Sequence, residues 1–313
     1  MPSRSTSPDP APATPGHSRA LVIAAFAAVY LVWGSTYLAI RFAVAELPPF
    51  ITAGVRFLVA GGILLLWARL QGDPLPAARE RRGATIGGLL LLLGGNGAVV
   101  WAEQFVPSGI AALIVATLPL WMVLLEWARP GGSRPRSGVF VGLALGLAGI
   151  ALLLDPTDAT GGVDAVGTIV LCLGSVSWAA GSIFMRHVPM PRSALMSNAT
   201  QMLAGGIGLA LLGGAVGEFG RLDLAAASPR ALLSVAYLIV FGSLIGFTAY
   251  TYILQVSTPA RVSTYAYVNP VVAVLLGWAL AGEAITVRTI AAAGVILLSV
   301  AIITLSSGSR RKT

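Results

Sequence analysis

The chain has 313 residues, of which 56% are hydrophobic and 10% charged, and its formal net charge is +8. A soluble domain carries about 25% charged residues, so a soluble protein of this composition would expose large apolar patches and aggregate. The composition therefore excludes a cytosolic enzyme and a free nucleic-acid-binding protein. It predicts a polytopic membrane protein whose partners are the lipid bilayer and a small-molecule substrate, with no nucleic acid.

Side chains with reactive chemistry are scarce. The sequence contains one cysteine, Cys172, two histidines and a single lysine, Lys312. One cysteine supports neither an intramolecular disulfide nor a cysteine metal cluster, and a phosphate-binding loop needs a lysine within the fold. We therefore expect no catalytic residue, no metal and no cofactor, and no ATP hydrolysis by this chain.

Apolar stretches follow one another along the chain, and a spanning helix needs about 20 apolar residues. The sequence predicts an all-α protein with ten transmembrane helices, preceded by a disordered cytoplasmic tail at 1–18, rich in Ser, Pro and Thr, and followed by a basic cytoplasmic tail at 307–313. A cleaved signal peptide is the alternative for the first span, but this span is too long for a signal core. The predicted spans are 20–43, 49–69, 83–102, 107–127, 138–154, 165–185, 193–216, 231–254, 259–281 and 287–306.

The basic residues predict the orientation of these spans. With a cytoplasmic N-terminus, fifteen Arg and Lys residues fall on the cytoplasmic side and five on the outer side. This asymmetry favours both termini inside the cell, because cytoplasmic loops carry an excess of basic residues. The five outer residues are Arg41, Arg56, Arg221, Arg230 and Arg288.

The two halves of the chain resemble each other. Trp33 and Arg41 are eight residues apart, as are Trp178 and Arg186, and Ala-Gly-Gly-Ile at 60–63 recurs at 204–207. Because each half holds five predicted spans, an odd number, the second must enter the membrane from the opposite face. We predict two inverted five-helix repeats, 19–155 and 164–306. At a constant offset of 151, Gly95, Trp101, Gln104 and Pro119 correspond to Gly246, Tyr252, Gln255 and Pro270.

Several longer segments resemble a known family. They are Trp-Gly-Ser-Thr-Tyr at 33–37, Ala-Gly-Val-Arg-Phe at 53–57, Gly-Asn-Gly at 95–97, Ala-Glu-Gln at 102–104, Val-Pro-Ser-Gly-Ile-Ala-Ala at 106–112 and Ser-Thr-Tyr-Ala-Tyr-Val-Asn-Pro at 263–270. On these segments the chain resembles the EamA-type branch of the drug/metabolite transporter (DMT) superfamily, and within that branch the YedA-like exporters. The resemblance covers essentially all ten spans. The resemblance implies an inner-membrane exporter of small metabolites with a cavity lined by spans 1, 3, 4, 6, 8 and 9. Family substrates range from amino acids to drugs, so it does not identify this one.

Polar side chains inside the spans are candidate substrate contacts. Asn269 and Tyr265 are four residues apart and share a helix face, and Asn96 shares a face with Glu103. The residues at the corresponding positions of the other half are apolar. Substrate contacts are expected to differ between the halves in this way, because a substrate is asymmetric whereas the scaffold is repeated. The alternative is hydrogen bonding between helices, worth about 0.6–2 kcal/mol.

Aromatic residues form a second group of candidates. Trp33, Tyr37, Trp101, Trp178 and Tyr267 can form a wall that accepts apolar or cationic solutes. The alternative is anchoring at the membrane interface. Trp33 and Trp178 lie too far inside their spans for that alternative.

Two prolines and one glutamate are candidate hinge or gate residues. Pro119 and Pro270 lie near the middle of spans 4 and 9, where each removes a backbone donor, and we expect hinges there, with ordinary packed kinks as the alternative. Glu103 lies at the outer end of span 3, where a gating or proton-coupling carboxylate and a solvated helix end are both consistent with the sequence.

Arg56 and a glycine stripe have structural interpretations that we favour. Arg56 can snorkel to the outer headgroups, pair with Glu46 or meet an anionic substrate, and we favour snorkelling or pairing. Gly138, Gly142 and Gly146 repeat every four residues, which allows close helix contact. We favour packing inside a monomer over contact in a homodimer.

The sequence predicts a secondary active transporter that exports small organic metabolites or drugs, either amino-acid-like or amphipathic, across the bacterial inner membrane by alternating access. The solute is expected to meet Asn96, Asn269, Tyr265 and Trp33 between the halves. The alternatives are a facilitative carrier or channel and, with little support from so few His, Cys and Lys residues, a membrane-embedded enzyme. Substrate identity, direction and proton coupling stay open.

Overall fold

The computed structural model describes residues 18–130, 137–153, 164–257 and 265–308, and all regular structure in these ranges is helical. Seven helical stretches are long and apolar enough to cross a membrane, and three further apolar helices accompany them. The predicted tails fall largely outside the described residues. The last helix continues to Gly308, into the predicted basic tail, a difference of the size at which helix ends fray.

The helices follow the predicted apolar stretches closely, because the length of an apolar run is the strongest signal in such a sequence. In the first half they are α1 (Arg19–Val44), α2 (Pro49–Leu70), α3 (Ala78–Gly88), η1 (Leu89–Asn96), α4 (Gly97–Ala102), α5 (Ser108–Val115), α6 (Leu118–Ala128) and α7 (Ser137–Leu153). In the second half they are α8 (Ala165–Met185), α9 (Ala194–Ala215), η2 (Glu218–Arg221), α10 (Pro229–Tyr237), η3 (Leu238–Ile245), α11 (Gly246–Val256), α13 (Tyr265–Ala281) and α14 (Val287–Gly308).

Three predicted spans are not uniform α-helices. The third span contains the π-helical segment η1, and the eighth contains the π-helical segment η3. The fourth span is interrupted at residues 116–117, between α5 and α6. These irregular stretches lie inside apolar runs, where hydropathy and helical spacing carry no sign of them.

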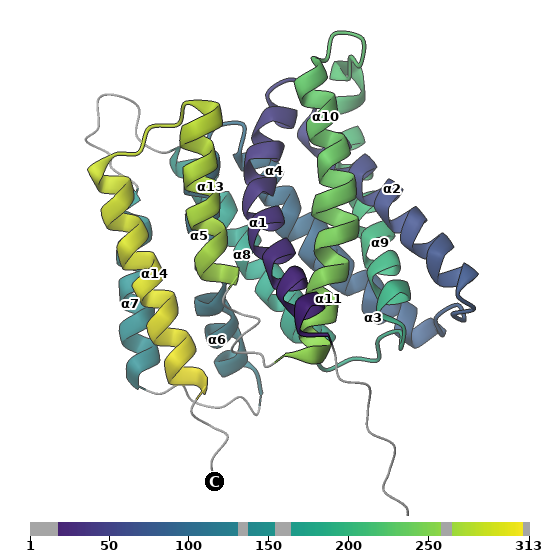
Figure 1. Cartoon of the computed structure of the whole chain (residues 1–313), viewed down its shortest axis with the longest axis horizontal. Helices are drawn as coiled ribbons and strands as arrows, with labels where there is room; N and C mark the ends of the chain where they lie inside the picture. Colours follow the sequence, from purple (N-terminus) through teal and green to yellow (C-terminus); the bar gives the residue numbers. More distant parts are fainter. Residues whose placement is uncertain (1–17, 131–136, 154–163, 258–264, 309–313) are drawn as a thin grey trace, which may run out of the picture.

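Two helix pairs form the lateral edges of the bundle, and each pair takes one helix from each half. In one pair α2 packs on α9, and in the other α7 packs on α14 (Figure 1). We call them the lateral pairs. Glycines bring their backbones together, since a Cβ built on Gly61 would lie 3.0 Å from the backbone nitrogen of Leu203. The predicted glycine stripe of α7 faces α14 of the same chain, and Ser299 donates to the carbonyl of Gly142 at 2.6 Å. The stripe therefore packs inside the chain.

At the upper end of the bundle in Figure 1, carboxylates of one half cap helices of the other. Glu46, which follows α1, accepts hydrogen bonds from the backbone N–H and hydroxyl of Ser228 before α10, at 2.6 and 2.7 Å. Glu283, which follows α13, accepts from the N–H and hydroxyl of Ser108, both at 2.7 Å, and from the N–H of Gly109 at 3.1 Å. These two contacts, the Glu46 cap and the Glu283 cap, satisfy helix N–H groups that have no partner within their helix.

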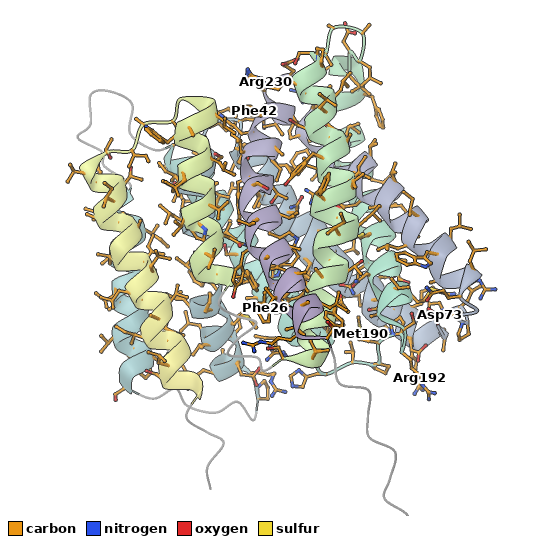
Figure 2. The ribbon with its side chains drawn as sticks, viewed as in Figure 1. Phe26, Phe42, Asp73, Met190, Arg192 and Arg230 are labelled. Atoms are coloured by element: carbon orange, nitrogen blue, oxygen red, sulfur yellow. The ribbon has the colours of Figure 1, made fainter. Side chains whose placement is uncertain are left out.

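Further contacts tie the halves at both ends. The guanidinium of Arg230 lies 4.6 Å from the ring centre of Phe42 at the same end as the two caps (Figure 2). Glu218 caps α2 there, accepting from the N–H of Ile51 at 2.8 Å. At the opposite end, where Figure 2 labels Asp73, the hydroxyl of Ser193 donates to Asp73. Both ends of the described bundle are thus held by polar contacts between halves.

Candidate functional site

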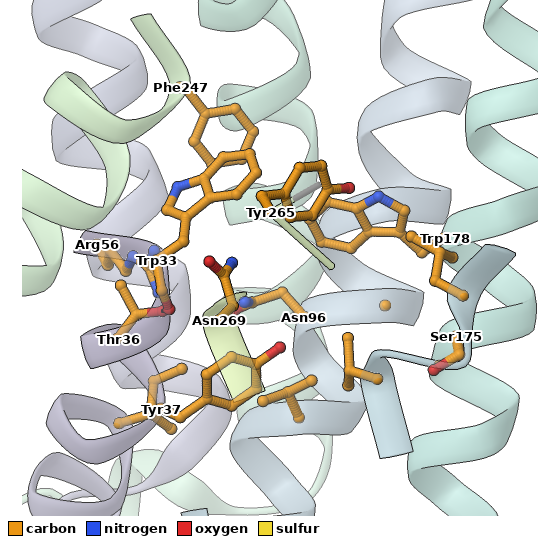
Figure 3. A pocket seen from close by; sticks show the side chains of 16 residues that line it. Trp33, Thr36, Tyr37, Arg56, Asn96, Ser175, Trp178, Phe247, Tyr265 and Asn269 are labelled. Carbon is orange, nitrogen blue, oxygen red and sulfur yellow. The ribbon is translucent and has the colours of Figure 1, made fainter. Parts of the chain in front are cut away.

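A cavity of about 100 Å³ lies in the interior of the bundle (Figure 3). Its walls come from α1, η1, α4, α5, α6, α8, α11 and α13, which are the spans that the family resemblance implies, with α2 in addition. Both halves of the chain therefore contribute to one shared space. The 16 lining residues are Trp33, Thr36, Tyr37, Ile40, Arg56, Gly95, Asn96, Val99, Val115, Leu118, Gly174, Ser175, Trp178, Phe247, Tyr265 and Asn269.

The structure brings most of the sequence-predicted binding residues together at this cavity. Trp101 does not line it, since its ring packs edge-on against Phe105 with 5.3 Å between ring centres. Trp101 is five residues after Asn96, about 140° further round the helix, and so faces another way. The side chain of Tyr267 lies outside those that the structure describes. The predicted residues that do line the cavity are Trp33, Tyr37, Asn96, Trp178, Tyr265 and Asn269.

Aromatic rings form one wall of the cavity. The ring centre of Trp33 lies 5.5 Å from Phe247, 5.0 Å from Tyr250 and 5.5 Å from Tyr265. Trp178, from α8 of the second half, packs against η1, where a Cβ built on Gly95 would lie 2.8 Å from its ring. Offset and edge-to-face geometries of this kind stabilise aromatic clusters, so the cluster gives this wall of the cavity an ordered apolar surface.

Each π-helical segment is tied to a helix of the other half. The hydroxyl of Ser177 in α8 donates to the carbonyl of Leu90 in η1 at 2.8 Å, and the indole N–H of Trp33 in α1 donates to the carbonyl of Gly242 in η3 at 3.3 Å. A π-helical turn shifts the backbone ladder, and such turns are frequent at functional sites. The Trp33 bond fixes the orientation of the indole in the aromatic wall.

The two asparagines lie in the middle of the cavity (Figure 3). The amide nitrogen of Asn269 is placed to donate to the carbonyls of Tyr30 and Tyr265, each at 3.2 Å. Asn269 thus joins α13 to α1, which agrees with the alternative of hydrogen bonding between helices, and it also lines the cavity. The Oδ1 atom of Asn96 is buried and has no hydrogen-bond partner among the described residues. Asn96 therefore has an unused hydrogen-bond acceptor at the cavity.

Arg56 is a lining residue that we interpreted wrongly from the sequence. It neither snorkels nor pairs with Glu46, which is bonded to Ser228. Its side chain is 4% exposed, its Nε donates to the hydroxyl of Ser243 at 2.9 Å, and its guanidinium carbon lies 4.7 Å from the ring centre of Phe57. The face of α2 that carries Arg56 packs against η3 of the second half. This contact cannot be predicted from the sequence around Arg56 alone.

The two candidate hinge prolines occupy different local structures. Pro119 is near the start of α6, just after the interruption at 116–117, whereas Pro270 lies inside α13, which stays helical around it. Val115 and Leu118 flank the interruption, and both line the cavity. The fourth span is therefore broken at the level of the site.

Glu103 is fully buried, which excludes the solvated helix end as its interpretation. Both carboxylate oxygens lack a hydrogen-bond partner among the described residues, and Arg41 donates to its backbone carbonyl. It lies within electrostatic range of Glu283 and Arg41 but does not line the cavity. In the described part of the chain, no group of three or more His, Cys, Asp or Glu side chains is placed to hold a metal ion.

Apolar helices of both halves surround a cavity with polar and aromatic lining, a feature that many membrane transporters share. The EamA-like transporter family matches this chain twice, over residues 20–155 and 165–305. The chain therefore belongs to the EamA-like transporter family.

Individual relatives agree with this assignment. The chain is 44% identical over 279 residues to the uncharacterized inner membrane transporter YedA of Escherichia coli K12, covering 89% of each chain. It is 25% identical over 296 residues to the uncharacterized transporter YvbV of Bacillus subtilis 168, covering 94% of each chain. A protein of known crystal structure with 22% identity shares the fold, with a TM-score of 0.63 over 91% of this chain and 98% of the other.

Proposed function

We propose that the protein is a secondary transporter that exports small organic solutes across the bacterial inner membrane by alternating access. One observation carries the proposal: a cavity inside the bundle is walled by both halves of the chain and lined by aromatic rings and polar groups. The family matches two successive segments. In the proposal, these segments are inverted five-helix repeats, and the seven long stretches and three further apolar helices are ten spans.

The lateral pairs are the proposed pivots of the motion. α2 and α9 are the second spans of their halves, α7 and α14 are the fifth spans, and each pair packs across the boundary between the halves. Rotation of the halves about these contacts opens one end of the cavity while it closes the other. The interruption before Pro119 and the missing backbone donor at Pro270 supply the flexible points near the site.

Charge gives the proposed orientation. The excess of basic residues on one side of the predicted spans supports a cytoplasmic position for both termini. The end that carries the Glu46 and Glu283 caps then faces outward. Because both caps join the two halves, their proposed role is to hold the outer end closed.

The Glu46 cap predicts a dependence on external pH. The hydroxyl and backbone N–H of Ser228 lower the pKa of Glu46, and the charge of Arg230 lowers it further. A lowered pKa means that the cap is complete at neutral pH and is lost as the pH falls through that lowered value. A thiol reagent reacts with the thiolate, whose fraction falls with pH, so access from outside the cell is measured relative to a free thiol at the same pH. We expect the labelling rate of a cysteine at Thr36, divided by the rate of that free thiol, to rise at acidic pH. In Glu46→Gln, the pH dependence should weaken, and a full dependence in that variant would exclude Glu46 as its source.

Transport is tested first by comparing the metabolites that cells with and without the protein release, and then by measuring flux of the solute so identified in proteoliposomes. Trp33→Ala should lower the flux at least tenfold, because an aromatic contact surface worth about 1.5–3 kcal/mol is lost. Trp101→Ala is the matched control and should leave the flux near the unmodified value. Unchanged flux in both Trp33→Ala and Asn269→Ala would overturn the site.

The facilitative carrier and the channel make a different prediction. A channel conducts through a continuous pore, and single-channel recording would show unitary currents that an alternating-access carrier does not produce. A facilitative carrier would show flux that does not depend on an imposed proton gradient. The named relatives are transporters, which supports a transporter over a membrane-embedded enzyme.

A further inference from the structure

The cavity contains one charge. Of the 16 lining residues, Arg56 alone is charged at neutral pH. Its side chain is 4% exposed, and its Nη1 atom is buried without a hydrogen-bond partner among the described residues. A buried guanidinium is costly unless a counter-charge and hydrogen bonds compensate its lost hydration.

The surroundings of Arg56 hold the guanidinium in place, and no ion pair to it is found among the described residues. Ser243 accepts from Nε at 2.9 Å, and the ring of Phe57 lies beside the guanidinium at 4.7 Å. Gly242 lies close beside it, since a Cβ there would lie 3.0 Å from Nη2 and would displace the guanidinium. Both neighbours are neutral, so the positive charge remains available to a ligand in the cavity.

Resting on the proposed transport function, we infer that the solute is a small monocarboxylic acid with an apolar or aromatic body, and that its carboxylate binds Arg56. A guanidinium and a carboxylate form charge-assisted, often bidentate hydrogen bonds. One carboxylate neutralises the one cation of the cavity, whereas a phosphate dianion leaves an uncompensated negative charge in the membrane interior. A neutral solute leaves Arg56 without a counter-charge.

The other lining residues determine which groups the solute can carry besides its carboxylate. The aromatic wall around Trp33 and Phe247 accepts an apolar body. The unused Oδ1 of Asn96 accepts a hydrogen bond, so a hydroxyl or amino group on the solute fits there. The structure thus favours an aromatic or branched acid that carries one hydrogen-bond donor in addition to its carboxylate.

Binding of matched probes to the full-length protein in nanodiscs tests this inference. The probes are phenyllactate, its neutral amide phenyllactamide, and phenyl phosphate, with quenching of tryptophan fluorescence as the readout. We expect phenyllactate to bind at least tenfold more tightly than the amide, and phenyl phosphate to bind more weakly than phenyllactate. Equal affinity for the acid and its amide, or no binding of phenyllactate, overturns the inference.

Variants connect the preference to Arg56. Arg56→Gln should abolish the preference for the acid over the amide, and Arg230→Gln, at an arginine outside the cavity, should retain it. If Arg56→Gln does not fold, Gly242→Ala keeps the charge and crowds Nη2, and should reduce the preference. Retention of the full preference in Gly242→Ala or in a folded Arg56→Gln contradicts the inference.

The binding assay separates this inference from the transport function. A protein that prefers the acid but shows no flux in proteoliposomes contradicts the proposed transport function and leaves the carboxylate site standing. A protein that carries its solute without any preference for a carboxylate contradicts the site and leaves the transport function standing.

Discussion

Gly61→Val is expected to abolish stable assembly of the bundle, while Gly62→Val on the same turn of α2 is expected to be tolerated. A Cβ at Gly61 would lie 3.0 Å from the backbone nitrogen of Leu203 and 3.0 Å from the Cβ of Met202. A Cβ at Gly62 meets no atom within 4 Å. Overpacking of this kind costs about 1–3 kcal/mol or more, and a backbone neighbour cannot change rotamer to relieve it.

The measurement is the yield of monodisperse protein in detergent and its midpoint of thermal aggregation. Both substitutions introduce the same β-branched residue into the same helix, so their effects on helix propensity match. Gly206→Val, whose Cβ would lie 2.9 Å from the backbone nitrogen of Leu58, should reproduce the loss from the α9 side. Equal losses in the Gly61 and Gly62 variants would show that helix propensity, and not the α2–α9 contact, is responsible.

The positions of the helices could be predicted from the sequence, and their irregularities could not. The sixth span, predicted at 165–185, is α8 from Ala165 to Met185, because apolar run length follows directly from bilayer thickness. The π-helical segments and the interruption at 116–117 leave that length unchanged. The two π-helical segments accept hydrogen bonds from Ser177 and Trp33 of the other half, partners that are remote in the sequence.

The correspondence between halves explains why part of the site could be found from the sequence. Asn96 corresponds to Phe247 and Leu118 to Asn269 at the offset of 151, and all four residues line the cavity. Equivalent positions of the two halves thus line the same cavity, with a polar residue from one half and an apolar residue from the other. Arg56 was misinterpreted because its surroundings in η3 are remote in sequence.

Glu283→Ala is expected to raise the exposure of the cavity to the outer side by about 5- to 30-fold. The carboxylate of Glu283 accepts hydrogen bonds from two backbone N–H groups of α5 and from the hydroxyl of Ser108. Losing a helix cap costs about 1–2 kcal/mol. In the proposed alternating-access cycle, this cost falls on the state in which the outer end is closed, because the cap joins α13 of one half to α5 of the other. The population of the outward-open state should therefore increase.

The readout is the rate at which a membrane-impermeant thiosulfonate, added outside intact cells, labels Thr36→Cys in a Cys172→Ala background. Glu80→Ala is the matched control and should leave the rate unchanged. The carboxylate of Glu80 caps its own helix α3, accepting from the N–H of Ala77 at 3.0 Å, and so this cap does not link the two halves. Asp73→Ala removes a contact between halves at the opposite end and should lower the rate, since it favours opening toward the cytoplasm. If Glu283→Ala and Asp73→Ala change the rate in the same direction, the two ends do not open in alternation.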